Sequence, residues 1–154
     1  MTGAPALFGK SLEAAQRWIN EVMEHLRVDD PQVAYRVLRG TLHALRDRLQ
    51  PEEAVDLGAQ LPTLIRGIYY EGWRPAGTPQ RLRTTEEFLD RIGRELVPPR
   101  DPDAAQAARA VFKVLSWHVT EGEIEDVLGM LPEPLRDLWP PAPRHRTMPA
   151  SMHR

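Results

Sequence analysis

The fold is decided by the stretch DPQVAYRVLRGTLHALRDRL, residues 30–49. Asp30 followed by Pro31 predicts a helix start, because a carboxylate accepts free amides there and proline loses no hydrogen bond at the first helical position. Apolar residues then recur at steps of three and four, which predicts a helix with one buried face. The members of this face are Val33, Ala34, Val37, Leu38, Thr41, Leu42, Leu45 and Leu49. The arginines of the stretch, expected mostly on the outer side, are Arg36, Arg39, Arg46 and Arg48.

A second copy of this pattern lies 70 residues further along the chain. Residues 12–66 match residues 82–136 without a gap, and most matched positions are apolar and fall at helical spacing. The Leu-Pro pair at 61–62 recurs in register at 131–132. The identical charged pairs are Glu53/Glu123, Asp56/Asp126, Arg39/Arg109 and Arg66/Arg136. We therefore infer two tandem copies of one helical unit.

Each copy is predicted to hold three to four helices. In the first copy they cover about 11–26, 31–49, 50–61 and a short segment after the Leu-Pro pair. The buried stripe of the first helix is predicted to consist of Leu12, Ala15, Trp18, Ile19, Val22 and Leu26. No alternating apolar pattern of useful length predicts a strand. The expected fold class is therefore all-α: a helical bundle of two tandem three- to four-helix repeats with pseudo-twofold symmetry.

The repeat also sets the expected domain boundaries. We expect a single helical domain over residues 1–139, with repeat one at about 11–70, a linker at 71–83 and repeat two at about 84–139. Residues 140–154 are rich in proline and arginine and contain no acid. Such a composition predicts a disordered tail.

Three helix starts in the second copy carry capping signals. Asp101, which is followed by proline, is expected to open its second helix. Thr84 with Glu87, and Thr120 with Glu123, match the capping box, in which each side chain binds the other residue's backbone amide. We therefore expect the Glu123 carboxylate to cap the start of its own helix.

Composition restricts the classes of protein that this chain can represent. The formal net charge of -2 argues against a dedicated nucleic-acid binder, and the absence of cysteine excludes disulfides and thiolate sites. No stretch approaches the roughly 20 apolar residues of a membrane span, and no signal peptide is apparent, so we expect a cytoplasmic protein without a membrane contact. Only two of the 20 basic residues are lysine, a bias that suggests a bacterium of high genomic GC content.

Motifs for catalysis or metal binding are missing from the sequence. None of the five histidines falls in a His-Glu-x-x-His or Glu-x-x-His motif, none of the three serines lies in a Gly-x-Ser-x-Gly elbow, and no glycine-rich phosphate loop occurs. Catalysis by carboxylates from distant segments stays open, because folding can bring such residues together. We predict no catalytic residue, no metal and no cofactor.

The duplicated charges allow two interpretations. They consist of Glu53, Asp56 and Arg66 in repeat one and Glu123, Asp126 and Arg136 in repeat two. They could form one ligand site per repeat, or the arginines could hold the Leu-Pro corner while the glutamates cap helices. We favour the structural interpretation, because a duplicated scaffold must copy its corners whereas an active site need not be copied.

An aromatic segment joins the two repeats. Tyr69, Tyr70, Trp73 and Arg74 mix aromatic rings with a cation, a combination that can anchor a protein partner or stack single-stranded bases. The same residues could instead pack over the seam between the repeats. We favour this second arrangement and keep the four residues as candidates for a partner or ligand site.

The chain resembles a known family in several segments. LHALRDRLQPEEA (42–54), AQLP (59–62), RGIYYEGW (66–73) and, in the second half, VLSWHVTEGE (114–123) with LWP (138–140) are similar to the bacterial family catalogued as domain of unknown function 2267. The resemblance covers roughly residues 12–141. It implies a helical fold and brings no activity or catalytic residues with it.

We therefore expect a helical module that binds an unidentified protein partner and is not an enzyme. The alternative is a small-molecule-binding protein with a pocket between the two repeats. A weak single-stranded nucleic-acid binder ranks third. The sequence does not predict an oligomeric state.

Overall fold

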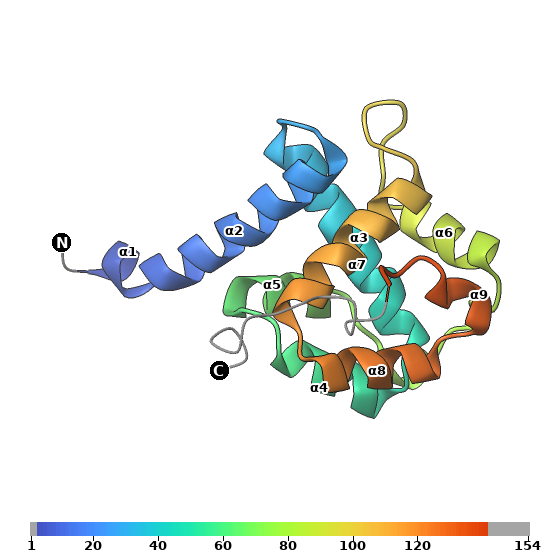
Figure 1. The fold of residues 1–154 in the computed structure, drawn as a ribbon. Helices are drawn as coiled ribbons and strands as arrows, with labels where there is room; N and C mark the ends of the chain where they lie inside the picture. Colours follow the sequence, from blue (N-terminus) through green and yellow to red (C-terminus); the bar gives the residue numbers. More distant parts are fainter. Residues whose placement is uncertain (1–2, 142–154) are drawn as a thin grey trace.

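A computed structural model describes residues 3–141, and within this range every regular element is a helix (Figure 1). The elements are α1 (Ala4–Leu7), α2 (Gly9–Leu26), α3 (Pro31–Arg48), α4 (Pro51–Ala59), α5 (Thr63–Tyr70), the 3₁₀ turn η1 (Pro75–Gly77), α6 (Thr85–Gly93), α7 (Ala104–His118), α8 (Glu121–Met130) and α9 (Glu133–Arg136). The predicted all-α class is confirmed. None of the helices in this range is long and apolar enough to cross a membrane. The predicted tail lies mostly outside the described residues.

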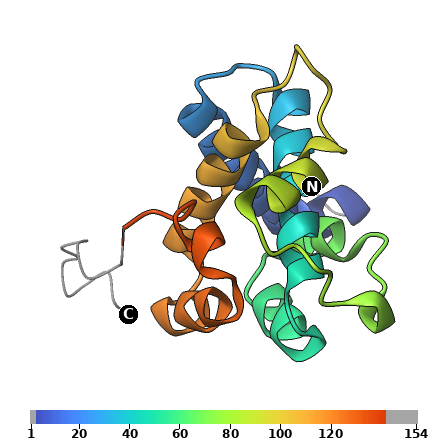
Figure 2. The same cartoon turned by 90° about the vertical axis from the view of Figure 1, so that its right-hand side faces the viewer.

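Helix α3 lies at the centre of the domain, with α2, α5, α6 and α7 packed against it (Figure 2). Its start is as predicted, because the Asp30 carboxylate accepts the Gln32 amide at 2.9 Å. Its burial extends beyond the apolar face, however. Arg46 and Asp47 are only 2% and 4% exposed. The prediction that Arg46 lies on the outer side is wrong, because α3 is covered by neighbours on several sides.

The second helix of the predicted repeat two, α7, begins two residues later than its sequence signal indicates. Asp103, not Asp101, is the N-cap of α7, and it forms a capping box with Gln106. Asp101 instead accepts Arg36 Nε at 2.8 Å and the Val97 amide at 2.8 Å. The predicted capping role of Asp101 is therefore wrong. Its carboxylate ties the loop before α7 to α3.

The two short helices α4 and α8 lie side by side at one end of the domain (Figures 1 and 2). Each follows a long helix and precedes a Leu-Pro corner, and they begin 70 residues apart. This element order is the one that the sequence repeat predicts. Internal duplication with pseudo-twofold symmetry stays a prediction.

The N-terminal end of α2, together with α1, projects away from the rest of the domain (Figure 1). We call residues 4–14 the N-terminal arm. Leu12 is 53% exposed, whereas Trp18 and Val22 further along the same helix are almost fully buried. Burial of Leu12 was predicted and is wrong, because the other helices do not reach this far along α2.

Gly58 in α4 leaves room for the aromatic residues of α5. A Cβ atom added at Gly58 would lie 2.8 Å from Tyr70 Cζ and 3.1 Å from Tyr69 Cε2, whereas one added at Gly67 would meet nothing within 4 Å. Both glycines are in helices. Of these two glycines, only Gly58 is required, because a larger side chain there would collide with Tyr69 and Tyr70.

We predict that Gly58→Ala lowers the free energy of unfolding and that Gly67→Ala raises it. Overpacking costs about 1–3 kcal/mol, which outweighs a gain in helix propensity of at most about 1 kcal/mol. At Gly67 nothing is overpacked, so only the gain in helix propensity applies. Urea denaturation followed by circular dichroism measures both effects. Equal stabilisation by the two alanines would show that Tyr69 and Tyr70 do not pack on α4 in this way.

Candidate functional site

Two glutamates face each other where α4 packs against α8. Glu53 and Glu123 are 7% and 8% exposed, and the buried Oε2 atom of each has no hydrogen-bond partner. Carboxylate oxygens of Glu53, Asp56 and Glu123 lie within 4.8 Å of one another. Asp56 is exposed, so this group of three acids reaches the surface at one side. We call these three residues the carboxylate cluster.

Neither glutamate caps a helix, so that part of the prediction is wrong. Thr120 accepts the Glu123 amide at 3.3 Å, but the Glu123 carboxylate does not bind the Thr120 amide in return. That amide donates to Gln60 Oε1 at 2.9 Å. Because Gln60 already satisfies the helix start, the Glu123 carboxylate can point toward Glu53 instead.

The electrostatics of the cluster are unfavourable for two charged glutamates. Burial, the contact with Glu53 and the negative charges of Asp56 and Asp126 raise the pKa of Glu123 to about 8. The fold therefore favours the protonated form of the Glu123 carboxyl when nothing else balances the charge. A fully ionised carboxylate accepts hydrogen bonds but donates none, so two such groups cannot satisfy each other.

The two arginines of the repeat corner bind backbone rather than the carboxylates. Arg66 donates to the carbonyl oxygens of Gly58 at 2.8 Å and Leu61 at 2.9 Å. Arg136 donates to the carbonyl oxygen of Leu131 at 3.1 Å. Each arginine thus contacts a Leu-Pro corner, and neither of them pairs with the carboxylate cluster.

The aromatic segment is divided between core and surface. Tyr69 is fully buried, its hydroxyl donates to the Ala54 carbonyl at 2.7 Å, and burial raises its pKa. The rings of Tyr70 and Trp73 are half-buried against the core with centroids 5.3 Å apart. Arg74 is exposed. Tyr69 cannot touch a partner in this conformation, whereas Tyr70, Trp73 and Arg74 reach the surface.

A buried polar network on α3 has no counterpart in our sequence predictions. His43, 3% exposed, has Nε2 2.7 Å from the Ile68 carbonyl oxygen and Nδ1 3.0 Å from Glu95 Oε2. Both ring nitrogens thus face acceptors. Glu95 also accepts hydrogen bonds from Arg39 and from Arg91, the latter at 3.1 Å. Burial alone would raise the pKa of Glu95, but the interactions with His43, Arg91 and Arg39 outweigh it and lower this pKa to about 2.

The network continues to the end of α5. Arg91 binds Asp47 Oδ2 at 3.1 Å, and Asp47 Oδ1 accepts from Arg46 at 2.8 Å. Arg46 also donates to the carbonyl oxygens of Tyr69 at 2.9 Å and Glu71 at 2.7 Å. A cation at this position satisfies carbonyls that a helix end leaves free. Every group in the network has a partner, so its geometry indicates a structural role.

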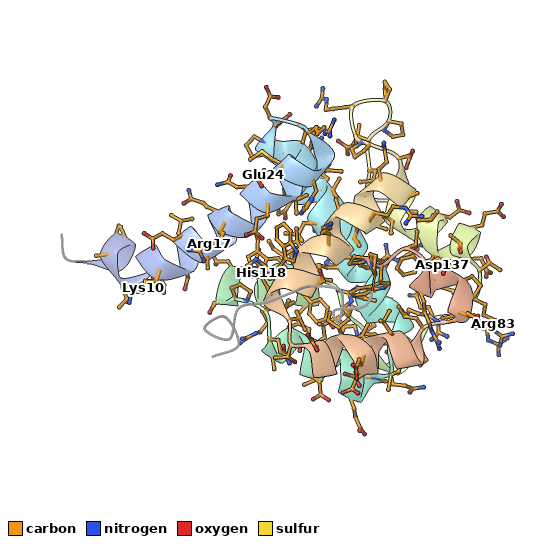
Figure 3. All side chains as sticks on the ribbon, in the orientation of Figure 1. Lys10, Arg17, Glu24, Arg83, His118 and Asp137 are labelled. Atoms are coloured by element: carbon orange, nitrogen blue, oxygen red, sulfur yellow. The ribbon has the colours of Figure 1, made fainter. Side chains whose placement is uncertain are left out.

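A pocket of about 290 Å³ opens between α2 and α7. It is lined by His25, Leu26, Pro102, Gln106, Arg109, Ala110 and Lys113. The buried His25 Nε2 has no partner, and burial together with the charge of Lys113 lowers the pKa of His25. His118, at the C-terminal end of α7, is not among the lining residues; its ring stacks on Trp18 of α2, and its Nε2 lies 2.6 Å from Glu21 Oε1 (Figure 3).

Among the described residues, the three most exposed large apolar side chains lie in the N-terminal arm. Leu7, Phe8 and Leu12 are 76%, 61% and 53% exposed. Sequence analysis assigned Leu12 to the core and gave no role to the other two. The one sequence feature that could have indicated Leu7 and Phe8 is that the apolar spacing of α2 continues toward the N-terminus beyond the predicted helix start.

We predict that Glu95→Gln lowers stability at neutral pH and loses this effect in acid. A folded pKa near 2 against an ordinary value of 4.5 corresponds to about 3 kcal/mol, present above pH 4.5 and lost as the pH falls toward 2. Urea denaturation at pH 7, 5 and 3 measures the difference between wild type and variant. Glu86→Gln, which removes an exposed acid from α6, is the control and should change stability little. A stability difference between wild type and Glu95→Gln that does not vary with pH would contradict the ionised state of Glu95 in this network.

A comparison with known families accounts for most of the domain. The sequence model of the family described as Uncharacterized conserved protein (DUF2267) matches residues 15–138. This range covers α3 to α9 and all but the first turns of α2, and it begins just after the N-terminal arm. No curated protein matches the sequence significantly. The protein therefore belongs to the DUF2267 family of uncharacterised conserved proteins.

Proposed function

We propose that this protein is a non-enzymatic interaction module that inserts its N-terminal arm into an apolar groove of a partner protein. The observation that carries the proposal is the exposure of Leu7, Phe8 and Leu12 on the N-terminal arm, which projects from the domain (Figure 1). Three neighbouring apolar side chains with little cover are costly in water, since burial of each stabilises by about 1.5–3 kcal/mol.

The exposed side chains continue the stripe that α2 uses to pack in the core. Phe8, Leu12, Ala15 and Ile19 follow one another at steps of three and four residues, and Ala15 and Ile19 are partly buried against the core. Amphipathic helices that occupy grooves use anchors at this spacing. The arm is thus a ready-made ligand for such a groove, held at a fixed position by the buried half of α2.

The size of the patch favours a groove over pairing with a second copy. A stable dimer usually buries about 800 Å² on each side, from roughly 20–30 residues. The arm offers three large apolar side chains on its eleven residues, 4–14, which suits a partner that surrounds a short helical segment. Lys10, Glu13 and Arg17 are exposed and lie on the side of α2 opposite this stripe, because successive residues of an α-helix are about 100° apart. They can therefore stay in water while a partner covers the apolar side.

The rest of the domain would serve as the rigid base of the arm. We infer that this base consists of two related helical units, as the 70-residue repeat suggests. The partner would be a cytoplasmic protein of a bacterial host, in line with the arginine-rich composition and the resemblance noted above.

The pocket between α2 and α7 supports a second candidate, a small-molecule-binding protein. Its volume of about 290 Å³ lies at the lower end of the range for ligand pockets, roughly 300–1,000 Å³. Arg109 and Lys113 line it together with the unpartnered His25 Nε2. Such a pocket suits a small anion that accepts hydrogen bonds.

We predict that Phe8→Asp combined with Leu12→Asp abolishes partner binding and leaves the stability of the domain unchanged. Both side chains contact solvent, and anchors of this kind contribute about 2 kcal/mol or more each to binding. A photo-crosslinking residue at position 8 in the host should give one protein adduct. An excess of a peptide covering residues 4–21 should suppress that adduct, and the same peptide with the two aspartates should not.

The matched control is a crosslinker at Leu64, which is 43% exposed on α5 and lies outside the arm. The proposal expects no adduct from that position. Identical adducts from both positions, or a wild-type dimer in sedimentation that the two aspartates dissociate, would contradict binding in a partner groove.

A further inference from the structure

We propose that Glu53, Asp56 and Glu123 form a binding site for one hard divalent cation between α4 and α8. The three side chains offer oxygens within 4.8 Å of one another. Oxygens that coordinate one such cation at about 2.0–2.6 Å span distances of this size. The acids come from helices that are 70 residues apart in the chain, so the site exists only in the folded domain.

The unpartnered oxygens are a second and independent indication. Glu53 and Glu123 are more than nine-tenths buried, and the Oε2 atom of each lacks any donor. The nearest arginines of the corner, Arg66 and Arg136, bind backbone carbonyls instead. Most buried polar atoms have a partner, so two such oxygens beside each other require an explanation. A cation would satisfy both of them at once.

The donor set determines the class of the cation. All three ligands are carboxylates, which suit Mg²⁺, Mn²⁺ and Ca²⁺, whereas zinc and copper prefer imidazole and thiolate ligands. The exposed Asp56 leaves one side open to water, which can complete the coordination shell. Asp126 adds negative charge nearby without belonging to the cluster. The cation would join α4 to α8, and hence the first half of the domain to the second.

This site is separate from the N-terminal arm. The arm binds through apolar contacts on α1 and α2, whereas the cluster lies between α4 and α8. A variant that loses partner binding should therefore still bind the cation, and a variant that loses cation binding should still bind the partner. The variants with aspartate at Phe8 and Leu12 should still bind the cation.

Calorimetric titration of the full chain with MgCl₂, MnCl₂ and CaCl₂ after treatment with EDTA tests the proposal. At least one of these cations should bind with a stoichiometry of one. Glu53→Gln and Glu123→Gln should weaken binding about tenfold or more, and each keeps nearly the same volume as the glutamate. Glu125→Gln removes an exposed carboxylate from the same helix and should bind as the wild type does.

Paramagnetic Mn²⁺ locates the site, because it broadens amide resonances close to it. The amides of residues 53–57 and 122–127 should broaden first. Binding that Glu125→Gln weakens as much as Glu123→Gln, or broadening spread over the surface acids, would overturn the proposal. So would a thermal stabilisation that sodium chloride of equal ionic strength reproduces. A cation-independent gain in stability in Glu123→Gln, without any cation binding to the wild type, would mean that the pair holds a proton instead.

Discussion

The structure depends on the burial of α3 from several sides, which requires partners inside the protein for the nearly inaccessible ionisable side chains of this helix. Arg46 and Asp47 are almost inaccessible, and so is His43. A buried charge without a partner costs several kcal/mol, so the ion pairs to Glu95 and Arg91 and the hydrogen bonds to the end of α5 are conditions for this arrangement. The network fixes α3 relative to α5 and α6, and the apolar contacts of α2 and α7 complete the core.

Away from this network, two places stand out. The carboxylate cluster has buried acceptors without donors, and the N-terminal arm has apolar side chains without cover. In natural proteins, groups that the fold leaves without partners or without cover often lie at functional sites. The carboxylate cluster is anionic and would bind a cation, whereas the N-terminal arm is apolar and would be covered by a groove of a partner. For this reason the proposals built on them are independent of each other.

Periodicity and capping residues predicted much of the fold, whereas tertiary surroundings decided the rest. The helix starts at Asp30 and Thr84 were predicted correctly, since a cap depends on residues within one turn. The burial of Arg46 and the exposure of Leu12 were not, because each depends on which helices lie beside that residue. The carboxylate of Glu123 likewise failed to cap its helix because Gln60, from the other half of the chain, took its place. The sequence named Glu53, Asp56 and Glu123 as possible ligands in two separate repeats, but their approach to one another depends on the packing of α4 against α8 and forms no motif in sequence.

The central claim is that α3 forms the interior of the domain while the arm on α2 stays uncovered until a partner binds. Native-state hydrogen exchange of the isolated protein, read residue by residue, tests it most directly. The account predicts that the amides of α3 exchange slowest, through global unfolding alone, and that those of residues 4–14 exchange orders of magnitude faster. An arm protected as well as α3, or an α3 that opens before the rest of the domain, would contradict it.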